Sequence, residues 1–208
     1  MSKTTNAPNH PNSPNSPKTA TLDDADSVSR SLARAFHDDP MMGFFFPDAA
    51  TREETLGRYF STLFTRQYAQ NAVCELTESA AAFWVPAEAA EKAAPDAGTI
   101  AELTALLGDT APLFGQAVAA SEAHTPEEPH WFLAVIGADP AAQGQGHGAA
   151  LLRSGLAQAD AAGLPVYLES SKESNLPFYA HFGFAVREEL RLPGGGPKLW
   201  SMWREAQV

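Results

Sequence analysis

The chain has 208 residues, 44% of them hydrophobic and 19% charged, which predicts a globular protein with a sizeable core. Its formal net charge of −11 argues against a nucleic-acid partner, because phosphate binding requires a basic surface. An acidic surface is compatible with a cationic substrate, and it equally serves solubility. No apolar run approaches the roughly 20 residues that span a bilayer, and the single cysteine, Cys74, allows no intrachain disulfide. We therefore expect a cytoplasmic protein that makes no membrane contact.

Residues 1–18 differ in composition from the rest of the chain. They contain the near-repeat "NHPNSPNSP" and almost no apolar side chains, so they cannot offset the entropy of ordering. The segment is polar and Pro-rich, without the apolar stretch of a secretory signal. We expect a disordered tail over residues 1–18 and a single folded domain over residues 19–208.

The amino-terminal half begins with helical patterns and then changes to strand patterns. Val28, Leu32 and Phe36 recur at helical spacing behind acidic residues, which predicts a helix over Asp23–His37 that Asp39-Pro40 ends. The remaining patterns predict helices over Ala50–Tyr68, Thr99–Leu107 and Ala111–His124, and a hairpin of the strands Val73–Thr77 and Ala80–Val85.

The carboxyl-terminal half alternates strands and helices. The expected elements are, in order, a strand at His130–Ala138, a helix at Gly146–Ala162, a strand at Pro165–Glu169, a helix at Asn175–Phe182, and strands at Phe184–Leu192 and Lys198–Arg204. A strand, a helix of ordinary crossover length and a strand imply a parallel pair joined right-handedly. The pattern therefore predicts an α/β (α+β) fold in which helices flank both faces of a mixed sheet.

A glycine-rich loop, Gln143–Gly148, follows one predicted strand and opens a helix. Gly144, Gly146 and Gly148 let the backbone approach a bound group, and the free N–H groups of a helix start favour an anion. The order is neither G-x-x-x-x-G-K-[ST] nor G-x-G-x-x-G, which disfavours P-loop nucleotidases and nicotinamide cofactors. Taken alone, the loop is a phosphate site or simply a flexible connection.

Two segments together resemble the GNAT acetyltransferases. Gln143, Gly146 and Gly148 match the Gln/Arg-x-x-Gly-x-Gly/Ala pattern of that superfamily, and "NLPFYAHFGF" at 175–184 matches a second motif. The segments "HWFLAVIGADP", "LESSKESNLPFY" and "GPKLWSMWR" are similar to the bacterial puromycin N-acetyltransferases. The resemblance implies the GNAT fold, in which the fourth and fifth strands are parallel and splayed apart.

The resemblance also implies acetyl-CoA as co-substrate. The pantetheine arm would pair with main chain between the splayed strands, and Gly137 would support a bulge that opens the gap. We interpret His147 as exposed beside the phosphates, and Asn175 either as a contact to the cofactor arm or as a helix cap. The implied cofactor-binding residues are Ile136, Gly137, Ala138, Gln143, Gly144, Gln145, Gly146, His147, Gly148, Asn175 and Tyr179.

For catalysis, the resemblance places a general acid at Tyr179. A phenol, with a pKa near 10, can protonate a departing thiolate, although a core aromatic is the plainer interpretation of this residue. The candidates for a general base or a water ligand are His130, which can also be structural, and Glu169 at the end of a strand. We expect no metal, since no His/Cys/Asp/Glu cluster has ligand spacing.

The acceptor is expected between the first two helices, where residues 36–46 are aromatic, sulfur-containing and acidic. These side chains either line a pocket for an amphipathic amine or fill the core. The candidate substrate-binding residues are Phe36, Asp38, Asp39, Met42, Phe45 and Trp131. The leading hypothesis is N-acetylation of a small-molecule primary amine, such as an aminonucleoside antibiotic. The alternatives are acetylation of a protein or metabolic amine, and a catalytically silent acyl-CoA-binding module. Exposed terminal strands allow a homodimer.

Overall fold

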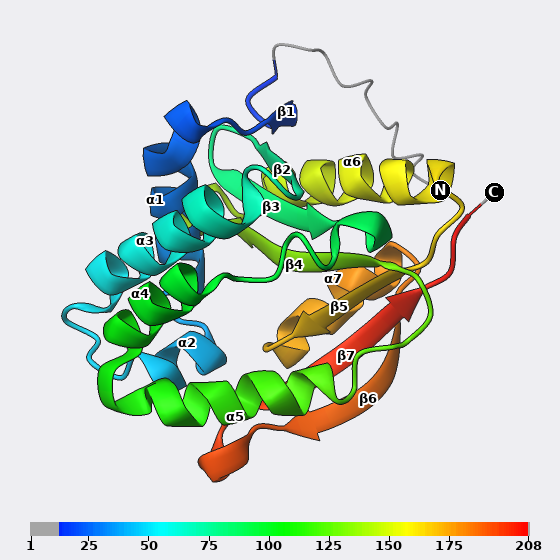
Figure 1. The fold of residues 1–208 in the computed structure, drawn as a ribbon. Coiled ribbons are helices and arrows are strands. Elements are labelled where there is room, and N and C mark those ends of the chain that lie inside the picture. Colours follow the sequence, from blue (N-terminus) through cyan, green and yellow to red (C-terminus); the bar gives the residue numbers. More distant parts are fainter. Residues whose placement is uncertain (1–12, 208) are drawn as a thin grey trace.

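A computed structural model describes residues 13–207, and its centre is a seven-stranded sheet (Figure 1). The strand order is β1-β2-β3-β4-β5-β7-β6, with β4 and β5 parallel and the other neighbours antiparallel. The strands are β1 (Lys18–Thr19), β2 (Val73–Leu76), β3 (Ala80–Val85), β4 (Trp131–Ala138), β5 (Val166–Ser170), β6 (Ala185–Arg191) and β7 (Lys198–Arg204). The predicted mixed α/β sheet with helices on both faces is confirmed.

Helices cover both faces of the sheet (Figure 1). They are α1 (Ala25–Phe36), α2 (Pro40–Phe45), α3 (Arg52–Thr62), α4 (Ala97–Leu107), α5 (Ala111–Glu122), α6 (His147–Ala161) and α7 (Leu176–His181). Helix α3 continues as a π-helical turn over Leu63–Tyr68. One core lies between the sheet and α1 to α5, and a second lies between the sheet and α6 and α7.

The second core depends on one close approach of a helix to the sheet. Leu151, Leu152 and Leu156 form the apolar face of α6 and are buried against β3 and β4. A Cβ at Gly155 would lie 2.1 Å from Cε2 of Trp84, so α6 packs on this strand only because residue 155 has no side chain.

Strands β4 and β5 pair over a short length and then separate. Their parallel register covers only Trp131↔Val166, Phe132↔Tyr167 and Leu133↔Leu168, although β4 continues to Ala138. The register between β3 and β4 shifts beside this point, because Phe83 faces Val135 and Trp84 faces Leu133, which leaves Ala134 as an extra residue. A bulge bends the strand that carries it. The sequence predicted a bulge at Gly137, and the structure places it at Ala134 instead.

Two expectations for the amino-terminal part need correction. Asp39-Pro40 ends α1 and also starts α2, because the Asp39 carboxylate accepts hydrogen bonds from the Met41 and Met42 N–H groups and proline suits a first helical position. The predicted tail over residues 1–18 lies partly outside the described residues, at 1–12. From Pro14 onward the chain contacts the domain, and Lys18–Thr19 pairs with β2.

Candidate functional site

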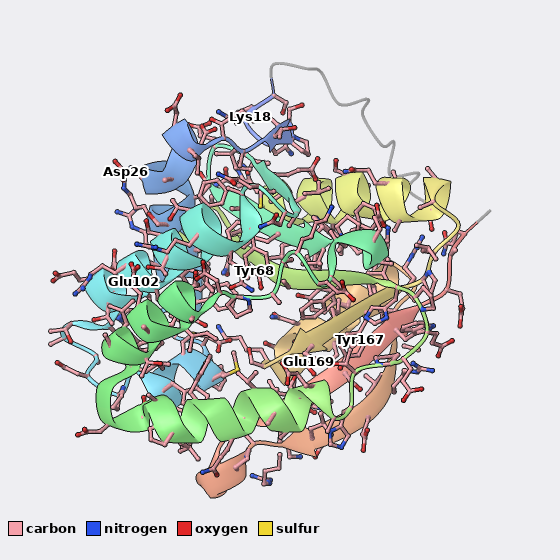
Figure 2. All side chains as sticks on the ribbon, in the orientation of Figure 1. Lys18, Asp26, Tyr68, Glu102, Tyr167 and Glu169 are labelled. Atoms are coloured by element: carbon pink, nitrogen blue, oxygen red, sulfur yellow. The ribbon has the colours of Figure 1, made fainter. Side chains whose placement is uncertain are left out.

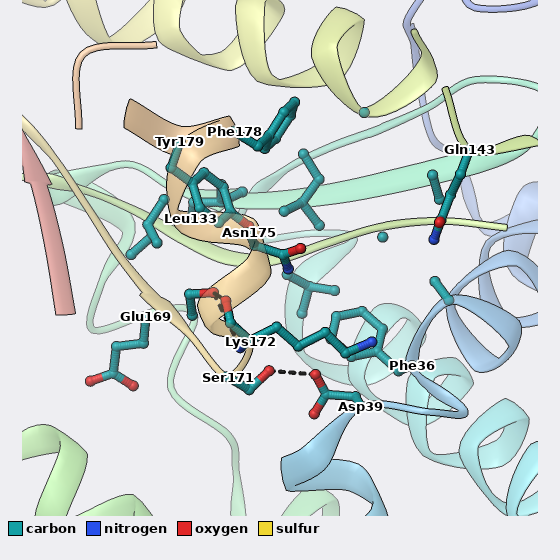
Figure 3. Close-up of a pocket in the computed structure, with 18 of the residues that line it drawn as sticks. Phe36, Asp39, Leu133, Gln143, Glu169, Ser171, Lys172, Asn175, Phe178 and Tyr179 are labelled. Atoms are coloured by element: carbon teal, nitrogen blue, oxygen red, sulfur yellow. Dashed lines mark hydrogen bonds between the residues drawn. The ribbon is translucent and has the colours of Figure 1, made fainter. Parts of the chain in front are cut away.

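The gap between β4 and β5 is the mouth of a cleft of about 550 Å³. The β4 main chain beyond Leu133 forms one wall, and Ser170 to Lys172, with α7, forms the other. The glycine-rich loop lies at one end, and the connection between α1 and α2 lies at the other. Figure 3 shows Tyr179, Asn175 and Lys172 on the α7 side, with Phe36 and Asp39 facing them.

The glycine-rich loop has the backbone geometry of an anion site. Gly144 and Gly146 have φ angles of +79° and +91°, in the left-handed region that favours glycine. Helix α6 starts at His147, so the N–H groups of its first turn have no acceptor within the helix and carry the positive end of its dipole. Of the predicted cofactor-binding residues in this loop, Gln143, Gly144, Gly146 and Gly148 line the cleft, whereas Gln145 is not among the lining residues.

His147 also lines the cleft, but it is not the exposed residue that the sequence predicted. Its side chain is 4% exposed, and Nδ1 lies 2.9 Å from Oγ1 of Thr77, which is buried too. The first helical turn points this side chain back toward β2, so His147 ties the start of α6 to the sheet.

Ile136, Gly137 and Ala138, whose main chain is predicted to pair with the cofactor arm, line the cleft on the β4 side. Over residues 13–207, no strand pairs with these residues on the β5 side, because β5 has already diverged. Gly137 has a different role from the predicted bulge. A Cβ there would lie 2.8 Å from Cβ of Ala35 and 2.9 Å from Cε2 of Phe36, so this glycine lets α1 pack against β4.

Tyr179 and Asn175 project from α7 and the turn before it into the same cleft. Tyr179 is 7% exposed, and its ring packs edge-on against Phe178 and Phe184. Burial raises the pKa of the Tyr179 phenol, and the nearby Asp39 carboxylate raises it further. The phenol is therefore a neutral hydrogen-bond donor throughout the physiological pH range.

Asp39 joins the two sides of the cleft. Its Oδ1 accepts from the Met41 and Met42 N–H groups at 2.9 and 3.1 Å, and its Oδ2 accepts a hydrogen bond from the Ser171 hydroxyl (Figure 3). The side chain is 4% exposed although it lines the cleft. Both oxygens accept hydrogen bonds within the protein, so Asp39 links the start of α2 to Ser171, and its pairing with a substrate cation stays a prediction.

Glu169, a residue of β5, also lines the cleft. Both of its carboxylate oxygens lie 2.7 Å from the Ser121 hydroxyl of α5, and Oε1 accepts a 2.8 Å hydrogen bond from Tyr167 (Figure 2). Tyr167 and Glu169 are two positions apart on β5 and therefore share one face of the sheet. The pKa of Tyr167 is raised by burial and by the adjacent Glu169 carboxylate, so the tyrosine stays protonated and remains a donor.

Besides Gln145, five of the predicted residues are not among those that line the cleft. His130 stacks edge-on against Tyr167 and Trp203, with Nδ1 2.7 Å from the Glu128 carbonyl oxygen. Asp38 is exposed and pairs with His37. The other three are buried in the cores, Met42 and Phe45 against α1 to α5 and Trp131 beneath α6 and α7.

Comparison with known proteins agrees with this geometry. The family model described as the acetyltransferase (GNAT) family matches residues 71–184, from before β2 to the end of the α7 motif. This chain belongs to the GNAT family. The matched stretch contains the glycine-rich loop, both splayed strands and Tyr179.

The related sequences and structures do not identify the substrate of this GNAT protein. An uncharacterized N-acetyltransferase of Schizosaccharomyces pombe is 36% identical over 69 residues, which cover 33% of this chain and only 28% of that relative. A Corynebacterium glutamicum structure described as "histone acetyltransferase HPA2 and related acetyltransferase" superimposes with a TM-score of 0.71 at 24% identity, covering 93% of this chain and 97% of that one.

A more distant structure shares the GNAT fold. The arylalkylamine N-acetyltransferase 2 of Aedes aegypti superimposes with a TM-score of 0.53 at 11% identity, covering 92% of this chain and 98% of that one. At these identities the likeness concerns the fold alone.

The GNAT cleft of this chain also contains side chains that were not selected from the sequence. They include Phe132, Ser171, Lys172, Phe178 and Leu199, and Met41 comes from the segment 36–46 that was predicted only as a whole. Phe132 was detectable, because strand alternation places it and the predicted Trp131 on opposite faces. Met41 follows from the unrecognised start of α2, which turns Met42 and Phe45 into the core. Leu199 comes from a distant strand, for which the local sequence carries no signal.

Two further observations cover the part of the GNAT chain that the structure describes. Within residues 13–207, no helix has the length and apolar character needed to cross a membrane. Over the same residues, no group of three or more His, Cys, Asp and Glu side chains is arranged to hold a metal ion.

Proposed function

We propose that this GNAT protein transfers the acetyl group of acetyl-CoA to the primary amine of an amphipathic small molecule, a class that includes aminonucleoside antibiotics. The observation that carries the proposal is a single continuous cleft. It connects the anion-binding geometry of residues 143–148, the unpaired β4 main chain, the Tyr179 phenol and an apolar end with a carboxylate.

The residues present fit acetyl-CoA. The open N–H groups at the start of α6 suit a pyrophosphate, which needs several donors and a positive dipole. The unpaired edge of β4 offers N–H and C=O groups to an amide-containing arm, in the manner of an added strand. Asn175 stands beside Tyr179 as a further polar contact. When bound, acetyl-CoA supplies a reactive thioester carbonyl and a thiol leaving group.

The proposed chemistry is direct attack. The neutral amine nitrogen bonds to the thioester carbonyl carbon, the carbon–sulfur bond breaks, and the sulfur receives a proton from the Tyr179 hydroxyl. The amine loses its own proton to water or to Glu169, and solvent returns a proton to Tyr179. A β4 N–H group, at Ile136 or Ala138, holds the charge that develops on the carbonyl oxygen.

The raised pKa of Tyr179 determines how it can donate a proton to the leaving sulfur. Proton transfer from so weak an acid to a free thiolate, whose thiol titrates at roughly 8.5, is uphill. Tyr179 therefore first donates a hydrogen bond to the sulfur while negative charge develops there. The hydroxyl proton passes to the sulfur as the amine loses its own proton.

Glu169 is the better placed of the two proposed bases. It lines the cleft, whereas His130 is held in an aromatic cluster on Tyr167 and Trp203. Its hydrogen bonds from Ser121 and Tyr167 fix the orientation of the carboxylate, so Glu169 suits binding of an ammonium group and orientation of a water molecule.

The acceptor end favours an amphipathic amine. Phe36, Met41, Phe132 and Leu199 supply apolar wall, and Asp39 and Glu169 are the carboxylates among the lining residues. This mixture of apolar surface and a few convergent polar groups is typical of small-molecule sites. Asp39 holds the shape of this end through Ser171.

An amine panel tests the proposal. The full chain is mixed with acetyl-CoA and with puromycin, arylalkylamines, polyamines, amino acids or amino-terminal peptides, and free thiol release is followed. We expect release with an apolar, small primary amine. Release with peptides alone would favour acetylation of a protein amine. Binding of CoA by calorimetry without thiol release from any amine would favour the silent acyl-CoA-binding module.

A further inference from the structure

The amino-terminal arm, Ser13–Thr19, contacts the glycine-rich loop through Asn15 and Gln145. Its β1 residues pair with β2, and the Pro14 carbonyl accepts a 3.0 Å hydrogen bond from the Glu78 N–H in the β2–β3 turn. The same turn reaches the start of the loop, where Ser79 O accepts a 2.8 Å hydrogen bond from Asp139 N. The arm and this turn therefore form one support for the segment that leads into the loop.

Asn15 makes the direct contact with the loop. Its Nδ2 donates to the Gln145 carbonyl oxygen at 3.3 Å. The amide is held in this orientation because the Ser13 hydroxyl donates to Asn15 Oδ1 at 2.5 Å, and a turn closed by Ser16 N and Ser13 O fixes the backbone. Both ends of the Asn15 amide thus have partners, which is the requirement for a defined amide orientation.

The bond sets the direction of the Gln145–Gly146 peptide. In a planar trans peptide the C=O and N–H groups point to opposite sides. A donor that holds the Gln145 oxygen on the Asn15 side therefore turns the Gly146 N–H away from the arm, and Gly146 lines the cleft. With φ at +91°, Gly146 could otherwise sample several orientations of this peptide.

Gly146 is also fitted to the arm. A Cβ at residue 146 would lie 3.1 Å from Nδ2 of Asn15, whereas a Cβ at Gly144 meets nothing within 4 Å. At residue 146, glycine therefore serves two purposes, since it adopts a left-handed backbone and leaves room for the Asn15 side chain. At residue 144, glycine serves only the left-handed backbone.

We infer that Asn15 is a positioning residue for the cofactor loop, so that the amino-terminal arm contributes to acetyl-CoA affinity. This inference rests on the proposed function, because it assigns the Gly146 N–H to the pyrophosphate. The bond orients the Gly146 N–H, so its loss costs affinity for the nucleotide end of acetyl-CoA. The chemistry at Tyr179 is not affected.

The test compares Asn15→Ala with Lys18→Ala, a control in the same arm whose side chain pairs with Asp24 and not with the loop. We expect Asn15→Ala to raise the acetyl-CoA KM and the CoA Kd about 3- to 10-fold, the effect of one hydrogen bond. The expected kcat, amine KM and melting temperature match those of the wild type. Asn15→Asp, which retains size but replaces the donor with a negative charge, should weaken binding further.

Equal acetyl-CoA KM and CoA Kd in Asn15→Ala and the wild type would overturn the inference. So would an equal loss in Lys18→Ala, or a loss matched by a lower melting temperature, because either would indicate general damage to the arm. A wild type that binds CoA but releases no thiol would overturn the proposed transfer alone, and the ratio of CoA Kd values would still decide the role of Asn15. A wild type that binds no CoA would overturn both.

Discussion

The hydroxyl of Ser121, near the end of helix α5, lies 2.7 Å from both carboxylate oxygens of Glu169 on β5. The two residues are 48 positions apart, and their contact fixes a carboxylate at the acceptor end of the cleft. Helix α5 therefore contributes to the site although its own residues are not among those that line the cleft. In Figure 1 this helix lies below β5 in the view.

Glu169→Gln tests the proposed role at the acceptor. Removal of the charge should lower kcat/KM for the amine about tenfold or more, because an ammonium group or a polarised water loses its partner, while the acetyl-CoA KM stays constant. Ser121→Ala should have a smaller effect in the same direction. Glu173→Gln, on the exposed turn before α7, is the matched control. Steady-state kinetics with both substrates varied would distinguish these cases, and an unchanged Glu169→Gln enzyme would remove the carboxylate from the mechanism.

Tyr179→Phe should lower kcat by about 10²- to 10³-fold and leave the CoA Kd within twofold, because the phenol acts at the sulfur and does not carry the cofactor. Tyr59→Phe is a suitable control, since Tyr59 is also a buried tyrosine, in the core on the α1 side of the sheet. A fall in CoA affinity that matches the fall in kcat would instead assign Tyr179 a packing role.

The pH dependence gives an independent check on Tyr179. Its pKa is raised by burial and by Asp39, so the protonated form that donates to sulfur persists beyond the ordinary range of about 10. We expect kcat to show no decline from phenol ionisation up to pH 10. A basic limb near pH 9 that disappears in Tyr179→Phe would contradict this assignment of the proton.

Local patterns in the sequence were sufficient for most of the fold. Strand β3 and helix α1 were found because a continuous apolar run or a helical spacing of apolar residues is a short-range property. The glycine-rich loop was found for the same reason, since Gln143–Gly148 combines a strand end, three glycines and a helix start within a few positions.

Contacts between distant segments account for what the sequence did not reveal. The partner of His147 is Thr77, 70 positions away, and the partner of the Gln145 carbonyl is Asn15, 130 positions away. The bulge at Ala134 depends on the register with β3, which the β4 sequence alone does not specify. The start of α2 did carry a local signal, which was interpreted too narrowly, because Asp39-Pro40 ends one helix and begins another.

Gly137→Ala should destabilise the fold and disturb the cleft together. The added methyl group would lie 2.8 Å from Cβ of Ala35 and 2.9 Å from Phe36, whose ring lines the cleft. Overpacking of this kind costs about 1–3 kcal/mol, and the melting temperature in thermal unfolding should fall accordingly. Gly57→Ala, in helix α3 with nothing within 4 Å of its Cβ, should be neutral or stabilising. Equal behaviour of the two variants would show that α1 does not pack as described.

Glu75 is a buried carboxyl group whose ionisation opposes folding. It is 8% exposed on β2, Oε1 accepts a 2.7 Å hydrogen bond from Ser154, and Oε2 has no partner among residues 13–207. Burial raises its pKa in the folded state above the unfolded value, despite the Ser154 hydrogen bond. The protonated form therefore adds stability at low pH, and this contribution is lost as the pH rises through the folded-state pKa.

Glu75→Gln should remove that pH dependence while retaining an acceptor for Ser154. We expect the variant to be more stable than the wild type at pH 8, by about 1 kcal/mol, and to lose this advantage toward pH 4, where the wild-type carboxyl is neutral. Chemical unfolding at several pH values measures the difference. Glu78→Gln, at an exposed position in the β2–β3 turn, should follow the wild type at every pH. A Glu75→Gln variant that is less stable at pH 8 would show that the ionised carboxylate has a stabilising partner, in conflict with its burial between β2 and α6.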